Sequence, residues 1–417
     1  MFGSGGKTFG QGMGRVHVLR VGRTAGLAGV LFAAAIAVLG FQTAPGMAKP
    51  FLPPFKPPAS ERLVSSIAVF GTDDRARMPA EGTTLADQIG VLVDLERKTV
   101  CTAFCVGHAT VMTAGHCLYP PGSREPARLK DIRFRRDLMT TRNDARIAGA
   151  SNGAGAQHVS AGTTRLSLRP PIDAVKDWAI ARLDRDVCPM GGLTLSRRTN
   201  EEIIELARER RVYQIAFHRD FQYFSRAIAR SCEVGRSFKD VGWETISQDF
   251  QEPQSLILHT CDTGGSSSGS PLLIDGADGP EVVGLNVGTY LQSNATAPLG
   301  GGAGRTVQAA ATTRDIANTA IAAHTIANIA IEFNRAEILS DPKQVRDVAA
   351  WLNEQRLYNG RRDGRYGPAL KSAIEAYEVR QGLAVTGFLT KSLWQRLDQQ
   401  RHRSRPPRIR DSAISAR

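Results

Sequence analysis

Three separated segments carry side chains that could together turn a serine into a nucleophile. His116 lies in the run Thr-Ala-Gly-His-Cys at residues 113–117, Asp177 precedes an apolar run, and Ser268 stands before Gly-Ser-Pro. A serine hydroxyl is a poor nucleophile at neutral pH, so it needs an imidazole to take its proton and a carboxylate to hold the imidazole in the right tautomer. Ser268 is preferred over the serines before it because the Gly-Ser-Pro that follows supplies a tight turn.

The chain order histidine, aspartate, serine resembles that of the chymotrypsin-like (trypsin-type) serine proteases. Subtilisin-like enzymes and α/β-hydrolases use other orders. The resemblance implies a serine endopeptidase with an all-β double barrel, acting on a protein or peptide substrate without a cofactor or a metal. It also implies an oxyanion hole made by the backbone amides of Ser266 and Ser268.

A closer resemblance, over about residues 85–300, is to the bacterial glutamyl endopeptidases. In that branch Cys-Thr-x-Phe-x-x-Gly precedes Thr-Ala-Gly-His-Cys, and here residues 101–107 read Cys-Thr-Ala-Phe-Cys-Val-Gly. The resemblance implies a disulfide between Cys101 and Cys117. The remaining pairs are then expected to be Cys232–Cys261 and Cys105–Cys188, although six cysteines allow 15 connectivities.

The residues expected to form the specificity pocket depart from the glutamyl endopeptidase pattern. Thr263 fits a position that grips the substrate glutamate, but Asn286 stands where that family has a histidine. Asp262 coincides with the position whose aspartate makes trypsin select Lys and Arg. A buried unpaired carboxylate is costly, so Asp262 either serves such a substrate or turns outward as a structural group.

The residue before the nucleophile also differs from that of the animal digestive proteases. Those enzymes have an aspartate there, which captures a newly cut N-terminus, whereas this chain has Ser267. Activation by insertion of a new N-terminus is therefore not expected.

The alternation of apolar residues predicts a β-barrel protease domain over residues 85–336. Ile89, Val91, Val93 and Leu95 fall on one face of an alternating run, and further short apolar runs follow between Gly, Pro, Asn and Asp turns. A Pro-rich segment at residues 49–84 reads as a linker or pro-segment.

After residue 340 the pattern becomes helical and predicts a small all-α domain over residues 341–398. Asp341 and a proline open the first helix, and three helices follow with apolar residues at helical spacing. The domain resembles the peptidoglycan-binding module of bacterial wall hydrolases, although Tyr377 and Glu378 replace its common Phe-Gln pair. The matching residues are 363–368, Ala373, Ile374, Tyr377, 381–383 and 386–390.

The two ends of the chain predict export and a basic tail. Residues 1–48 hold four basic and no acidic residues around an apolar run at residues 25–41, which indicates a secretory leader, with retention as a membrane anchor as the alternative. Cysteines in an exported chain favour disulfides. Residues 401–417 hold six Arg and one Asp and read as a disordered tail. Nothing resembling a nucleic-acid module accompanies the net charge of +13.

These features together predict a secreted or periplasmic serine endopeptidase tethered to peptidoglycan, with no integral membrane segment once the leader is cleaved. The alternative is a catalytically degenerate protease that serves as a cell-wall binding module.

Overall fold

The computed structural model describes residues 68–78, 84–121, 128–139, 141–142, 144–222, 224–230, 232–294 and 312–404. The predicted leader, its apolar run, most of the Pro-rich segment and the chain beyond Ser404 lie outside these residues. Within the described residues, no helix is both long and apolar enough to cross a membrane.

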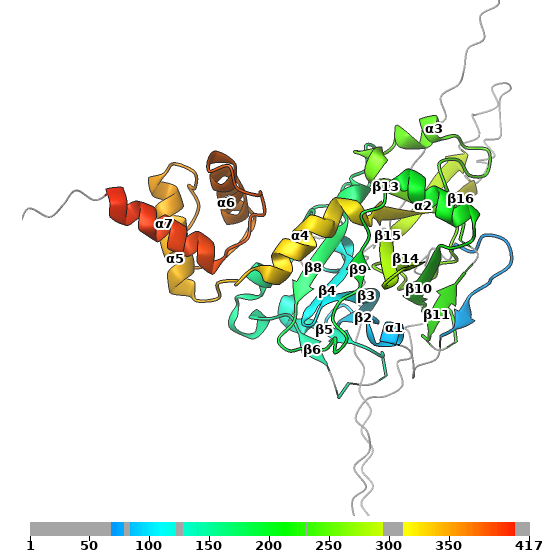
Figure 1. The fold of residues 1–417 in the computed structure, drawn as a ribbon, viewed down its shortest axis with the longest axis horizontal. Helices are drawn as coiled ribbons and strands as arrows, with labels where there is room; N and C mark the ends of the chain where they lie inside the picture. Colours follow the sequence, from blue (N-terminus) through cyan, green and yellow to red (C-terminus); the bar gives the residue numbers. More distant parts are fainter. Residues whose placement is uncertain are drawn as a thin grey trace, which may run out of the picture. The chain divides into compact units, whose positions relative to one another are not determined.

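The first barrel is a seven-stranded antiparallel sheet with the order β6-β5-β2-β3-β4-β8-β7 (Figure 1). Most strands that are neighbours in this sheet also follow one another in the chain, as β-hairpins require. The strands are β2 (Ile89–Asp94), β3 (Thr99–Gly107), β4 (Thr110–Ala114), β5 (Ile132–Arg135), β6 (Ala145–Arg146), β7 (Val159–Ala161) and β8 (Trp178–Arg182).

Strand β2 differs from the half-exposed strand that its alternation predicts. All six of its residues are buried, because Leu92 packs in the barrel core while Val91 and Val93, on the opposite face, pack on Phe217 of the second sheet. Leu95 lies beyond the strand and is 45% exposed. The strand is therefore covered on both faces.

The second barrel is a nine-stranded sheet with the order β1-β11-β10-β14-β15-β16-β13-β12, and β9 pairs with β15 off this path. All its pairs are antiparallel except β9 with β15. The strands are β1 (Ala76–Arg77), β9 (Thr194–Leu195), β10 (Tyr213–Phe217), β11 (Arg226–Ala229), β12 (Val234–Gly235), β13 (Leu256–His259), β14 (Pro271–Gly276), β15 (Gly279–Asn294) and β16 (Thr312–Ala322).

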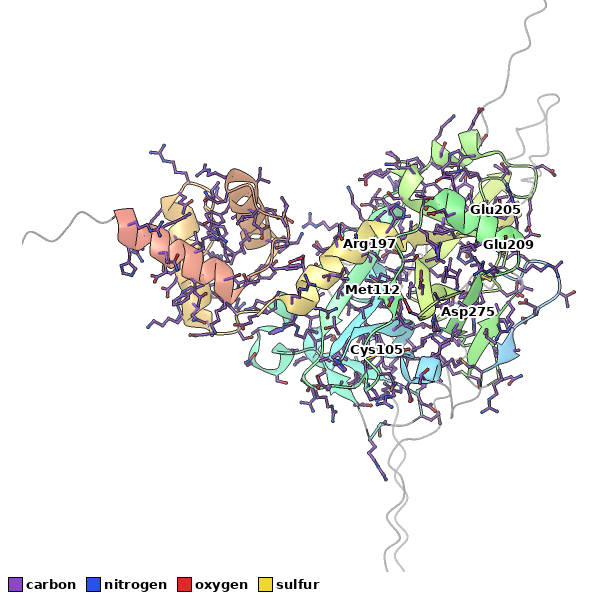
Figure 2. All side chains as sticks on the ribbon, viewed as in Figure 1. Cys105, Met112, Arg197, Glu205, Glu209 and Asp275 are labelled. Carbon is purple, nitrogen blue, oxygen red and sulfur yellow. A yellow bond between two sulfur atoms is a disulfide. The ribbon has the colours of Figure 1, made fainter. Side chains whose placement is uncertain are left out.

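In the described part of the chain, four α-helices accompany the barrels: α1 (Thr84–Asp87), α2 (Asn200–Arg208), α3 (Trp243–Ser247) and α4 (Ala323–Arg335). Helix α2 begins with a capping box between Thr199 and Glu202, which satisfies two of its free N–H groups. Its apolar side packs on the second barrel, while Figure 2 shows Glu205 on the helix and Glu209 directly after its end. The fold class predicted from the sequence, an all-β double barrel followed by a small α-domain, is confirmed.

The C-terminal domain consists of α5 (Pro342–Glu354), α6 (Pro368–Arg380) and α7 (Lys391–Ser404) (Figure 1). Asp341 caps α5 by accepting the N–H of Lys343 at 2.9 Å. The residues at helical spacing form one shared core, namely Val345, Val348, Ala349, Leu352, Leu370, Ala373, Ile374, Tyr377, Leu393 and Leu397, with Trp394 packed against it.

Two predicted segments differ locally from the structure. Residues 401–404 belong to helix α7, whereas the sequence placed them in a disordered tail; Arg401 pairs with Glu354 and lies over the Trp351 ring, which extends the helix. Residues 68–78, at the end of the predicted linker, pack on the second barrel through β1, which pairs with β11.

Candidate active site

His116 lies on a single 3-10 turn, Gly115–Cys117, directly after β4. The turn is tied to β3 by the disulfide between Cys101 and Cys117. A bridge that closes a 16-residue separation removes loop entropy from the unfolded chain and so favours the folded position of the turn. The imidazole is therefore presented at the end of β4 by a short, cross-linked segment.

The carboxylate of Asp177 holds His116 at two points. Its Oδ2 lies 2.7 Å from Nδ1 of His116, and its Oδ1 accepts the backbone N–H of His116 at 2.7 Å. Asp177 precedes β8, which pairs with β4 so that Trp178 lies opposite Ala114, and this register places the two residues together. The Asp177 side chain is only 4% exposed, which strengthens its bond to the ring.

The protonation of His116 is set by two opposing effects. Burial of the imidazole works to lower the pKa of His116, but the charge of Asp177 and the hydrogen bond to it outweigh burial. The pKa of His116 is raised above the ordinary value of 6.5 as a result. A ring held in this way is suited to accept a proton from a nearby hydroxyl.

Ser268 is positioned from the first barrel by Thr102. The N–H of Thr102 donates to the carbonyl of Ser268 at 2.9 Å, and its hydroxyl donates to the carbonyl of Ser266 at 2.9 Å. Gly269 follows with φ +84°, and a Cβ there would lie 2.2 Å from Oγ1 of Thr113, so only glycine fits. No hydrogen bond joins His116 to Ser268 among the described residues, and catalytic hydrogen bonds of this kind often tighten only when substrate binds.

The backbone amides of Ser266 and Ser268 have no acceptor in the described part of the chain, whereas Ser267, Gly269 and Ser270 all donate their N–H groups to carbonyls. Ser266 has φ +84°, a conformation that costs a residue other than glycine on the order of 1–3 kcal/mol. The surrounding contacts must maintain this strained turn. Two free amides near a serine form an arrangement that can bind an oxyanion.

Asp262 does not offer a free carboxylate to a substrate. Its Oδ1 accepts the N–H of Phe70 at 2.8 Å, and its Oδ2 accepts the N–H of Asp74 at 3.0 Å. The side chain is buried, and burial raises its pKa despite these two bonds. Of the two alternatives that the sequence leaves open, the geometry favours the structural one.

The other two expected specificity residues belong to a network of neutral groups. Thr263 donates its hydroxyl to Oδ1 of Asn318 at 3.2 Å, and Thr289 donates to the same oxygen at 2.7 Å. Asn286 donates from Nδ2 to the carbonyl of Ser267 at 3.1 Å, and its Oδ1 lies 3.1 Å from Nε2 of the buried His259.

His259 adds no positive charge to this network. Burial lowers its pKa to about 3, although the bond to Asn286 works in the opposite direction. Its Nδ1 accepts the N–H of Cys261 at 3.3 Å, so the proton lies on Nε2, which donates to Asn286. The side chains that hydrogen-bond to Thr263 and Asn286 are therefore uncharged.

The six cysteines form three disulfides in the structure, Cys101–Cys117, Cys105–Cys188 and Cys232–Cys261. Figure 2 shows Cys105 in the first barrel near Met112, on the neighbouring strand. His116 stands close to Cys101 and Cys117, but both sulfur atoms are bonded to each other. Zinc binds thiolates, so this group does not offer a zinc site.

Sequence reasoning did not assign roles to Thr102 or Asn318. Thr102 lies inside the Cys-Thr-x-Phe motif, which was the only available signal for it. Asn318 lies on β16, 55 residues from Thr263, and has no local motif. Its contact with Thr263 depends on the pairing of β16 with β13 and β15.

Comparison with known families identifies both parts of the chain. Residues 101–285 match the trypsin-like peptidase domain, and residues 341–397 match the peptidoglycan binding domain. In class the protein is a trypsin-like serine endopeptidase. It combines that domain with a C-terminal peptidoglycan-binding domain, as the motifs predicted.

Among solved structures, a Glu endopeptidase in complex with MPD overlaps this chain with 16% identity and a TM-score of 0.37. The overlap covers 64% of this chain and 98% of that one. It is too loose to bear on specificity. A comparison with curated proteins finds no match.

In the peptidoglycan-binding domain, Glu378 on α6 binds the loop that precedes α7. The carboxylate accepts the N–H groups of Thr386 and Gly387 at 2.6 and 2.8 Å, and the Thr386 hydroxyl at 2.7 Å. Glu378 therefore holds the loop before α7.

Proposed function

We propose that the protein is an exported serine endopeptidase that hydrolyses peptide bonds through His116, Asp177 and Ser268 while attached to peptidoglycan. The observation that carries the proposal is the short bond between His116 and Asp177 beside a serine turn with two free amides. Disulfides persist in oxidising compartments, so the three disulfides support export through the leader at residues 1–48.

In the proposed reaction Oγ of Ser268 attacks the scissile carbonyl while Nε2 of His116 takes the hydroxyl proton. Asp177 keeps the other ring nitrogen protonated and stabilises the imidazolium that forms. The carbonyl oxygen becomes an oxyanion, which the amides of Ser266 and Ser268 bind. Each such donor is worth about 10²–10³-fold in turnover.

Collapse of the tetrahedral intermediate breaks the peptide C–N bond and leaves an acyl-enzyme on Ser268. His116 returns its proton to the leaving amine in that step. A water molecule then attacks the ester and loses a proton to His116. The C–O bond to Ser268 breaks, His116 returns the proton to Oγ of Ser268, and the acid product leaves.

Reaction of the intact protein with a fluorophosphonate, followed by peptide mapping, tests the proposal. We expect a single covalent adduct on Ser268. Circular dichroism on the same sample shows that the protein is folded. A folded protein without any adduct would contradict the proposal and favour a degenerate protease that binds the cell wall.

For substrate selection, we expect cleavage after small or neutral residues whose side chains reach Thr263. The side chains that hydrogen-bond to Thr263 and Asn286 are uncharged. Charge-assisted hydrogen bonds are roughly twice as strong as neutral ones, so these groups cannot offset the loss of water around a glutamate carboxylate. Profiling on a mixed peptide library measures the preference. Predominant cleavage after Glu would sink this expectation. Cleavage after Lys or Arg that disappears in Asp262→Ser, while cleavage after other residues persists, would establish the trypsin-like alternative.

For attachment, we expect the full chain to sediment with purified peptidoglycan and a protein ending at residue 337 to remain soluble and active. A chain ending at residue 404 is the matched control, because it keeps α7 complete and removes only residues 405–417. Attachment through that basic segment must weaken at raised salt. Equal sedimentation of the full chain and the protein ending at residue 337 would instead locate binding in the protease domain.

A further inference from the structure

Residues 68–75, here called the strap, lie against the segment that leads into the nucleophile turn. Ala68 exchanges two backbone hydrogen bonds with Thr263, each of 3.0 Å. The buried carboxylate of Asp262 accepts the N–H groups of Phe70 and Asp74. The strap is thus bonded to the two residues directly before Gly264.

Arg75 anchors the other end of the strap. Its guanidinium donates to Asp73 through Nε and Nη2, at 2.9 and 2.8 Å, and Nη2 also lies 2.8 Å from Oδ2 of Asp220. The Arg75 side chain is only 3% exposed and lies over the Phe221 ring, with its central carbon 5.2 Å from the ring centroid. A buried guanidinium that bonds two carboxylates fixes the orientation of both, here those of Asp73 and Asp220.

Asp220, whose carboxylate Arg75 holds, packs directly on Gly264 at the start of the nucleophile turn. A Cβ on Gly264 would lie 1.8 Å from Oδ1 of Asp220 and 2.9 Å from Nη1 of Arg75, so both side chains press on this glycine. The N–H of Gly264 donates to Nδ1 of His218 at 3.1 Å. The N–H of Arg219 donates to the carbonyl of Gly265.

His218 is kept as a neutral acceptor in this arrangement. Burial, and next the charge of Arg75, lower its pKa to about 3, against the opposite effects of Asp220 and Asp73. A protonated ring would have no lone pair for the N–H of Gly264. Arg75 therefore supports the same glycine through contact and through the charge state of His218.

The contacts end where the strained turn begins. Ser266 follows Gly265 with φ +84°. Thr102 holds the carbonyls of Ser266 and Ser268 from the first barrel, and the residues that lead into the turn need support of their own. We propose that the strap is a built-in activation element, in which Arg75, acting through Asp220 and Gly264, is a positioning residue for the oxyanion hole.

A consequence concerns processing of the chain. The active enzyme must retain residues 68–75, so its N-terminus lies before Ala68, as leader cleavage after residue 48 would leave it. N-terminal sequencing of fluorophosphonate-labelled protein should find an N-terminus before Ala68. A labelled form that begins after Arg75 would overturn the proposal.

Steady-state kinetics of Arg75→Ala and Asp220→Asn test the positioning role, which rests on the proposed function. We expect each to lower kcat by about 10²-fold with little change in KM, because a misplacement of about 1 Å costs that much. Binding of a peptide aldehyde, whose adduct carries an oxyanion, should weaken in parallel. Arg75→Lys should recover only part of kcat, since lysine keeps the charge without the fork.

Arg77→Ala is the matched control, because Arg77 is exposed two residues further along the chain, and we expect its kcat to be unchanged. Melting curves separate positioning from folding, and Asp220→Asn keeps the packing if Arg75→Ala unfolds. Variants with a lower melting temperature but wild-type kcat below it would overturn the proposal. A wild-type protein that does not label contradicts the proposed function itself, whereas a labelling wild type with active variants contradicts only the strap.

Discussion

A Ser268→Ala protein is expected to lose roughly 10⁶-fold in kcat for peptide hydrolysis and to form no fluorophosphonate adduct. The methyl group leaves His116 without a hydroxyl to deprotonate, and no acyl-enzyme can form. The free amides of Ser266 and Ser268 remain, so a residual rate above that of water should persist. Active-site titration and hydrolysis of a peptide substrate measure both quantities.

Ser267→Ala is the matched control for this experiment. It removes a hydroxyl one residue away and leaves intact the backbone N–H and carbonyl through which Ser267 bonds to Gly264 and Asn286. We expect it to label at Ser268 at a rate close to that of the wild type. An adduct or substantial hydrolysis in Ser268→Ala would show that another residue is the nucleophile.

Asp177→Asn is expected to fold and to lose about 10⁴-fold in kcat. An amide nitrogen facing Nδ1 of His116 donates a hydrogen bond, so it places the ring proton on Nε2. That nitrogen must be unprotonated to accept the proton of Ser268. Circular dichroism together with kcat at neutral pH checks the expectation, and an Asn variant with more than a tenth of wild-type activity would remove Asp177 from the triad.

The pH dependence of kcat/KM supplies a second measurement on the same pair. Protonated His116 is inactive, so activity is present above its pKa and is lost as pH falls through it. Since Asp177 raises the pKa of His116, the acid limb of the wild type should have its midpoint above pH 6.5. In Asp177→Asn only the effect of burial remains, and the midpoint should move to lower pH.

Local patterns were sufficient to predict the fold class and the two domains. The β-barrels follow from apolar alternation between turn residues, and the helical domain follows from Asp341 and the helical spacing of residues such as Val345, Val348 and Leu352, all of which are buried together. The sequence by itself also identified candidate catalytic residues, because His116, Asp177 and Ser268 each stand in a short motif whose order excludes other architectures.

Tertiary structure decided what depends on contacts between distant residues. Asp262 meets Phe70 across 192 positions, and this contact favours a structural role for the carboxylate over a trypsin-like one. The same is true of Arg75 with Asp220, 145 positions apart. A charged side chain has many possible partners, and only the packed chain selects one of them. Types and order of chemical groups are local properties of the sequence, whereas the direction in which a buried polar group points is set by the partner that the fold places beside it.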